Sequence, residues 1–154
     1  MNNLFFASAF LFNPAASIGQ HQIYHSVDRS AIHDHDQVLS KKYHLMDSGI
    51  GKLGVLLCYE SVRSKWAKIA AKEGAQLLIG LSNPADAEYS LLPYYHLRLD
   101  QMRAIETGLY FLRSSPNGFT ALIDPQGRIQ SRSDLRKEQI LNFEIPLHKY
   151  RATN

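Results

Sequence analysis

The chain has 154 residues, with 17 Lys and Arg against 14 Asp and Glu, a formal net charge of +3, and 45% hydrophobic residues. This length suits one domain with its own core, and the slight, scattered charge lacks the basic footprint of a nucleic-acid-binding protein. The single cysteine excludes an intramolecular disulfide framework and a cysteine-rich metal centre, and no apolar run approaches the ~20 residues that span a bilayer.

The N-terminal third predicts a hairpin followed by a loop. Residues 4–12 form an aromatic-rich apolar run that ends at Asn13-Pro14, and residues 20–27 alternate polar and apolar side chains. These patterns indicate two paired strands. Between residues 28 and 51 no period holds, and charged residues, histidines and glycines accumulate, so we expect a loop. The residues before Leu4 carry no basic side chain, so a signal peptide is not expected and the sequence leaves the localisation unknown.

The remainder of the chain alternates strands and helices. Apolar runs predict strands over 52–58, 76–81, 109–114, 119–124, 128–132 and 139–145, and helical periodicity predicts helices over 62–73 and 94–107. In the second helix we expect Leu97, Met102 and Ile105 to face inward and Gly108 to form the C-terminal cap. Helices that cross between strands imply parallel neighbours. The sequence therefore predicts an α/β domain with a mixed sheet and two main helices.

The one thiol, Cys58, ends the predicted strand over 52–58, shortly before a helix begins. Reactive groups collect at the carboxyl end of strands in open sheets, where helix N-termini lower the pKa of a thiol. This position suits a nucleophile, although a buried structural cysteine is an equally common fate of a lone cysteine on an apolar strand. Glu60 follows closely and would orient a substrate or a cationic partner, or would interact with the helix dipole.

Five blocks occur in order between residues 52 and 128. They read GVLLCYES (54–61), GAQLLIGLSN (74–83), PYYHL with QMRAIETG (93–97 and 101–108), RSSPNGFTA (113–121) and IDPQGR (123–128). Each block alone is a weak signal. In this order and at this spacing they resemble the nitrilase (carbon–nitrogen hydrolase) superfamily, in its apolipoprotein N-acyltransferase branch.

The resemblance implies a nitrilase-like α-β-β-α sandwich, of which residues 1–154 would form a partial domain, the C-terminal portion. It implies a Glu, Lys and Cys triad, whose thiolate attacks an acyl carbonyl and forms a thioester that passes to an amine or to water. Cys58 matches the nucleophile, and Tyr59 and Glu60 match the residues beside it. The Lys and the backbone N–H after the cysteine would hold the oxyanion. The acyl donor would be a phospholipid or an amide, and no cofactor is expected.

The same blocks suggest residues near the substrate pocket, namely Asn83, His96, Arg113 and Asn117. His96 and Asn117 also fit satisfied polar groups at the ends of elements. Arg113 fits either a partner that favours the thiolate or a surface ion pair.

Arg103 and Glu106 lie three residues apart on a predicted helix, which favours an intrahelical ion pair. The resemblance implies that they pack this helix near the active-site sheet. A second cluster, HDHD at 33–36, contains ligand types that zinc or nickel accepts. No helix fixes its geometry, so a solvated polar loop is the better interpretation and no metal is expected.

The chain departs from the family pattern at two places. It offers no match for the base Glu, and Ser26 stands where the Lys is expected; Lys41, Lys42 and Lys52 lie nearby, but solvated lysines are far more common. After Asn83 the family's DAWFG becomes PADAEY, which replaces an aromatic that could line a lipid groove with a carboxylate.

Two hypotheses follow from these departures. Either the chain is an enzyme portion whose Glu and Lys come from an N-terminal segment or a partner chain, or it is a truncated, inactive remnant or binding module. By resemblance, a homodimer through helices near the nucleophile is a further expectation. A full acyltransferase would lie in the bacterial inner membrane with this domain facing the periplasm.

Overall fold

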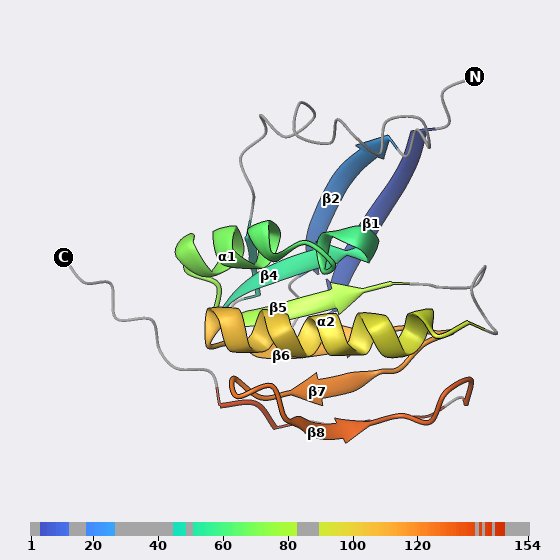
Figure 1. The fold of residues 1–154 in the computed structure, drawn as a ribbon. Helices are drawn as coiled ribbons and strands as arrows, with labels where there is room; N and C mark the ends of the chain where they lie inside the picture. Colours follow the sequence, from blue (N-terminus) through green and yellow to red (C-terminus); the bar gives the residue numbers. More distant parts are fainter. Residues whose placement is uncertain are drawn as a thin grey trace.

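The computed structural model describes residues 4–12, 18–26, 45–48, 51–82, 90–137, 139, 141–142 and 144–146 (Figure 1). Its strands are β1 (Leu4–Phe12), β2 (Ile18–Ser26), β3 (Met46–Asp47), β4 (Lys52–Leu57), β5 (Leu77–Leu81), β6 (Tyr110–Ser114), β7 (Ala121–Ile123) and β8 (Ile129–Arg132). The 3₁₀ turn η3 (Cys58–Glu60) precedes helix α1 (Ser64–Lys72), and helix α2 (Leu92–Thr107) lies between β5 and β6 in the chain.

Six strands form one mixed sheet in the order β3-β4-β5-β6-β7-β8. The central strands β4, β5 and β6 are parallel, and β3, β7 and β8 pair antiparallel with their neighbours. Strands β1 and β2 form a separate antiparallel hairpin, as their sequence patterns predicted, and they contact β4 and β3 respectively. The α1 and α2 crossovers return the chain to the same edge of the sheet, which is how parallel neighbours are joined.

Both helices cover one face of the sheet and pack against each other (Figure 1). Alternation along each strand divides the apolar residues between two clusters, because successive side chains of a strand point to opposite faces. The cluster on the helix face contains Leu56, Trp66, Ala67, Ala70, Ala75, Leu78, Leu97, Ala104, Phe111, Phe119, Ala121 and Ile123. The cluster on the other face contains Met46, Leu53, Val55, Leu57 and Leu77. The sheet is therefore buried on both faces around β4 and β5.

Helix α1 lies close to β4 because Gly54 has no side chain. A Cβ atom at this position would lie 2.8 Å from Ala70 Cβ and 2.8 Å from Leu78 Cδ2, closer than real Cβ contacts. The glycine thus sets how near the helix that follows Cys58 can come to the strand that precedes it.

The inward face of α2 differs from the prediction. Leu97 is buried as expected, but Met102 and Ile105 are 50% and 58% exposed. The buried residues of the helix are instead Pro93, His96, Leu97, Asp100, Arg103 and Ala104. A polar stripe of His96, Asp100 and Arg103 faces inward, because buried partners for its charges lie on β6 and in the segment before α1. Gly108 caps the helix at a φ of 67°, in the left-handed region that glycine adopts without strain, which confirms that prediction.

Two further predictions concern segments that the structure describes only in part. The predicted strand over 139–145 is wrong for residues 139, 141, 142, 144 and 145, which are irregular. Most of the predicted loop over 28–51 lies outside the described residues, and within that range Met46–Asp47 form the short strand β3.

Candidate active site

Cys58 follows β4 directly and begins η3. Its φ of 50° lies in the left-handed region that few residues other than glycine adopt. A non-glycine residue held in this conformation costs on the order of 1–3 kcal/mol and persists only where the surroundings impose it. Such an outlier at a strand-to-turn junction presents the side chain at the sheet edge, and the Cys58 residue is solvent-exposed. This geometry is typical of a nucleophile.

Hydrogen bonds hold this turn from both sides. The Glu60 carboxylate is buried and its Oε2 accepts a 2.8 Å hydrogen bond from the Leu57 N–H. The Ser61 N–H and Oγ both donate to the Cys58 carbonyl, at 3.3 and 3.2 Å. Glu60 therefore stabilises the turn that carries the thiol, in the manner of a capping residue.

The sheet register brings three strand ends together at one edge. Leu57 pairs with Leu81, and Leu81 pairs with Ser114. The residues after these strands therefore meet where ligands bind in open α/β sheets. Of the expected pocket residues, Asn117 lies in the turn after β6 and is half-buried, whereas Asn83 lies outside the described residues.

Arg113, on β6, is the largest fully buried side chain beneath this edge. Its Nη1 lies 2.5 Å from Asp100 Oδ2, its Nη2 donates to Ser82 Oγ at 2.6 Å, and the same Nη2 lies 3.4 Å from His96 Nδ1. Both members of the Arg113–Asp100 ion pair are buried. Arg113 therefore does not form the surface ion pair that was one of its two predicted roles. Arg113 and its three partners, which we call the Arg113 group, link the end of β5, β6 and α2 beneath the strand ends.

Burial dominates the electrostatics of this group. Desolvation raises the pKa of Asp100 to about 6, against the lowering effects of Arg113, of a hydrogen bond with Ser61 and of Arg103. Desolvation and the charge of Arg113 both lower the pKa of His96. At neutral pH the carboxylate is therefore mostly ionised and the imidazole is neutral.

The pKa of the Cys58 thiol is raised above its ordinary value, although the residue is exposed. Desolvation by the surrounding protein is the largest cause, and the Glu60 charge adds to it. A hydrogen bond from the Tyr59 backbone and the charge of Arg113 act in the opposite direction. The described residues thus leave Cys58 as a thiol at neutral pH, and an attacking thiolate would need a base.

Tyr59, the residue after the thiol, makes a ring contact with His96 of α2. The Tyr59 ring is 64% exposed, and its centroid lies 6.4 Å from that of the buried His96 ring in an edge-on arrangement. Tyr59 is therefore open to a substrate, while His96 lies in the layer beneath it.

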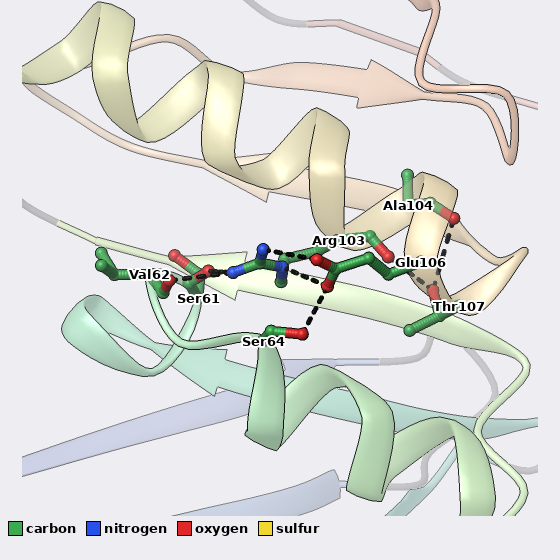
Figure 2. Close-up of polar contacts among 7 residues, drawn as sticks. All are labelled: Ser61, Val62, Ser64, Arg103, Ala104, Glu106 and Thr107. Atoms are coloured by element: carbon green, nitrogen blue, oxygen red, sulfur yellow. Dashed lines mark hydrogen bonds and ion pairs between the residues drawn. The ribbon is translucent and has the colours of Figure 1, made fainter.

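Arg103 and Glu106 of α2 bind each other and also the segment that leads into α1 (Figure 2). Arg103 Nη1 donates to the Val62 carbonyl at 2.8 Å, and the Ser64 hydroxyl donates to Glu106 Oε2 at 2.7 Å. The intrahelical ion pair is confirmed, and the same two side chains join α2 to the start of α1.

Asp100, Ser82 and Ser61 were not among the site residues that the sequence predicted. The spacing of His96, Asp100 and Arg103, at i, i+4 and i+7, puts three polar side chains on one helical face and was the available signal for Asp100. Ser61 and Ser82 fall inside the GVLLCYES and GAQLLIGLSN blocks, but local sequence assigned them no role because their partners come from other elements.

Of the lysines considered for the triad and the histidines considered as metal ligands, Lys52 alone lies within the described residues. Lys52 is exposed at the opposite end of β4 from Cys58, roughly 20 Å away at ~3.3 Å per residue, too far to reach the thiol. Residues 33–36, Lys41 and Lys42 lie outside the described residues. Within the described ranges no group of three potential metal ligands occurs, and no helix there is long and apolar enough to cross a membrane.

Comparison with known proteins gives one family match and several relatives. The model of the carbon-nitrogen hydrolase family matches residues 37–154. The apolipoprotein N-acyltransferase of Geobacter metallireducens is 31% identical over 102 residues, which are 66% of this chain and 20% of that protein. The enzyme of the same name from Azotobacter vinelandii is 37% identical over 102 residues, 66% of this chain and 19% of that protein. The chain thus spans only a small part of the curated relatives it matches.

Solved structures share the fold. Nit3 of Saccharomyces cerevisiae, a member of branch 10 of the nitrilase superfamily, aligns with a TM-score of 0.63 at 23% identity, over 85% of this chain and 50% of that chain. A carbon-nitrogen hydrolase from Helicobacter pylori G27 aligns with a TM-score of 0.57 at 18% identity, over 62% of this chain and 41% of that chain. The α/β architecture with two helices on a mixed sheet is therefore that of nitrilase-superfamily proteins.

Proposed function

We propose that this chain, which belongs to the carbon–nitrogen hydrolase family, carries the nucleophile of a thiol-dependent acyltransferase or amide hydrolase. The observation that carries the proposal is the position of Cys58 in a left-handed conformation, exposed at the edge where the parallel strands end. Holding a thiol there costs conformational energy, which is the mark of a functional constraint rather than of a packing residue.

The reaction would proceed through a thioester. The Cys58 thiolate would attack an acyl carbonyl carbon, a C–S bond would form, and the C–O or C–N bond to the leaving group would break as that group takes a proton. An amine or water would then attack the thioester and release the thiol. The Tyr59 N–H, whose hydrogen bond to the sulfur lowers the pKa of the thiol, would stabilise the oxyanion.

The base and the lysine of the family's triad would come from another part of the polypeptide or from a partner chain. The raised pKa of Cys58 supports this dependence, because a thiol that is protonated at neutral pH needs a base nearby. Tyr59, Asn83, His96, Arg113 and Asn117 would line or support the substrate site, with Arg113 acting through its charge from beneath.

The name of the curated relatives and the sequence blocks together suggest an acyl acceptor and a donor. By analogy with this name, the acceptor would be an amine of an apolipoprotein, and the resemblance of the sequence blocks to the same branch implies a phospholipid donor. A small amide as donor and water as acceptor form the competing assignment, and the carboxylates of the PADAEY segment (84–89) favour this less lipophilic substrate.

An inactive binding module is the second candidate. The raised pKa of Cys58 and the distance of Lys52 from the thiol favour it for the chain by itself. In this case the fold would bind an acyl compound or a partner without turnover.

Intact-protein mass spectrometry distinguishes these candidates. The chain is incubated with phosphatidylethanolamine vesicles or with propionamide, and the Cys58→Ser variant serves as the control. An acyl mass increment that hydroxylamine removes and that Cys58→Ser lacks would establish the thioester and its donor class. No increment from either donor, at pH values up to 9 where more thiolate forms, would refute acyl transfer by this chain and leave the binding module.

A further inference from the structure

Arg103 connects α2 to the turn that carries the thiol, although it lies on a different element. Its side chain is only 4% exposed. Nη1 donates to the carbonyls of Val62 at 2.8 Å and of Ser61 at 3.4 Å (Figure 2). These carbonyls belong to the segment between η3 and α1 and lie three and four residues beyond Cys58.

The guanidinium is itself held in place by Glu106. Nη2 donates to Glu106 Oε1 at 3.0 Å, and Nε lies 2.9 Å from Glu106 Oε2. This hydrogen bond and this ionic contact hold the guanidinium against the carboxylate, and a lysine, with a single ammonium group, offers no such pair of nitrogens. Glu106 also accepts the Ser64 hydroxyl, so that the start of α1 is tied to the same pair (Figure 2).

A short relay of hydrogen bonds leads from these carbonyls to Cys58. The Ser61 residue whose carbonyl Arg103 binds also donates its N–H and its hydroxyl to the Cys58 carbonyl. The Val62 N–H donates to the Tyr59 carbonyl at 3.2 Å. Arg103 therefore restrains the two residues that in turn restrain Cys58 and Tyr59.

The strained backbone explains why such a restraint is needed. A left-handed cysteine relaxes to an ordinary conformation unless the residues on both sides prevent it. Glu60 supplies the restraint on the strand side, through the Leu57 N–H. On the helix side, restraint from outside the turn's own backbone comes from α2, where Arg103 donates to the Ser61 and Val62 carbonyls and Asp100 hydrogen-bonds Ser61.

We propose that Arg103 is a positioning residue for the Cys58 nucleophile, which keeps the Tyr59 N–H directed at the reacting carbonyl oxygen. The inference rests on the proposed role of Cys58 as an acyl acceptor. It goes further in assigning the orientation of the oxyanion donor to a side chain on α2 that touches neither the thiol nor the substrate.

Two small probes of Cys58 separate orientation from general integrity. In p-nitrophenyl acetate the thiolate attacks the carbonyl carbon, the C–S bond forms through an oxyanion, and the C–O bond breaks to release p-nitrophenolate. In iodoacetamide the thiolate displaces iodide at a saturated carbon and no oxyanion develops. The ratio of the two rate constants therefore reports the oxyanion donor and cancels changes in the thiolate fraction.

Arg103→Gln is expected to lower the acylation rate by at least about 10-fold while alkylation changes by less than about 2-fold, since loss of an oxyanion donor costs about 10²–10³ in rate. Arg103→Lys, which keeps the charge and one donor, should recover part of the ratio. Thr107→Val is the matched control, because Thr107 donates only within α2, to the Arg103 carbonyl at 2.7 Å and to the Ala104 carbonyl at 3.4 Å, without touching the turn (Figure 2).

Hydrogen exchange supplies a readout that is independent of acylation. The peptide covering residues 57–63 should exchange faster in Arg103→Gln, while the β5 peptide over 77–81 keeps its protection. If wild-type Cys58 resists p-nitrophenyl acetate, the proposed function fails and exchange alone decides the positioning role. An unchanged rate ratio together with unchanged exchange in 57–63, or equal losses in Thr107→Val, would overturn the inference.

Discussion

Removing the positive charge from the buried Arg113–Asp100 pair should destabilise the fold strongly. Both side chains are almost fully buried, with Nη1 and Oδ2 2.5 Å apart. In Arg113→Met the Asp100 carboxylate would lose its ion pair in a buried site. Breaking a buried pair in this way costs about 3–5 kcal/mol, a large share of the about 5–15 kcal/mol that holds a domain folded.

The pH dependence of this loss follows from the pKa of Asp100. Desolvation raises the pKa from 3.8 to about 6, so the folded state binds the proton more tightly than the unfolded state. The ionisation of Asp100 therefore lowers the free energy of unfolding as pH rises from about 4 through 6, by about 3 kcal/mol in total at pH 7. Without Arg113, the main opposing influence, the pKa rises further and the loss extends to higher pH.

Urea unfolding followed by the fluorescence of Trp66, the one tryptophan of the chain, measures both effects. Arg113→Met should lose more stability at pH 7.5 than at pH 5, where Asp100 can take up a proton. The double variant Asp100→Asn/Arg113→Met should be more stable than Arg113→Met at pH 7.5, because no charge stays buried. A loss below about 1 kcal/mol in Arg113→Met, or a double variant no more stable than the single one, would refute the buried-pair reasoning.

Three further outcomes are expected. Gly54→Ala should lower the free energy of unfolding by about 1–3 kcal/mol in urea, because its Cβ would lie 2.8 Å from Ala70 Cβ; an unchanged midpoint would show that α1 can move away. Gly108→Ala should cost about 1–2 kcal/mol in the same assay, since φ is 67° there while space is open, and a neutral result would contradict the left-handed cap. Alkylation of Cys58 by iodoacetamide should reach half its maximal rate only above the ordinary thiol pKa of ~8.5, because desolvation raises the pKa. A midpoint near pH 7 would show an activated thiolate instead.

The local pattern of the sequence determined most of the fold. Short apolar runs, with polar and apolar alternation over 20–27, predicted the hairpin and the strands from β4 to β8, and glycines marked where helices end. The position of Cys58 at a strand end was also readable, because it depends only on where one run stops. These features follow from steric and hydrophobic preferences that act over a few residues.

The face that α2 turns toward the sheet was decided by the tertiary structure. The helix has an apolar set that includes Met102 and Ile105 and a polar stripe of His96, Asp100 and Arg103, and periodicity alone favoured the apolar set. The polar stripe is the buried face because its hydrogen-bond and ion-pair partners lie in other parts of the chain.

Asp100 binds Arg113, 13 residues away, and Arg103 binds the Val62 carbonyl, 41 residues away. A buried charge is tolerated only where such partners satisfy it, and no short window of sequence contains both members of either contact. The thiol's position could therefore be predicted from the sequence alone. Its electrostatic surroundings and the restraint on its turn exist only once β4, β6 and α2 have packed together.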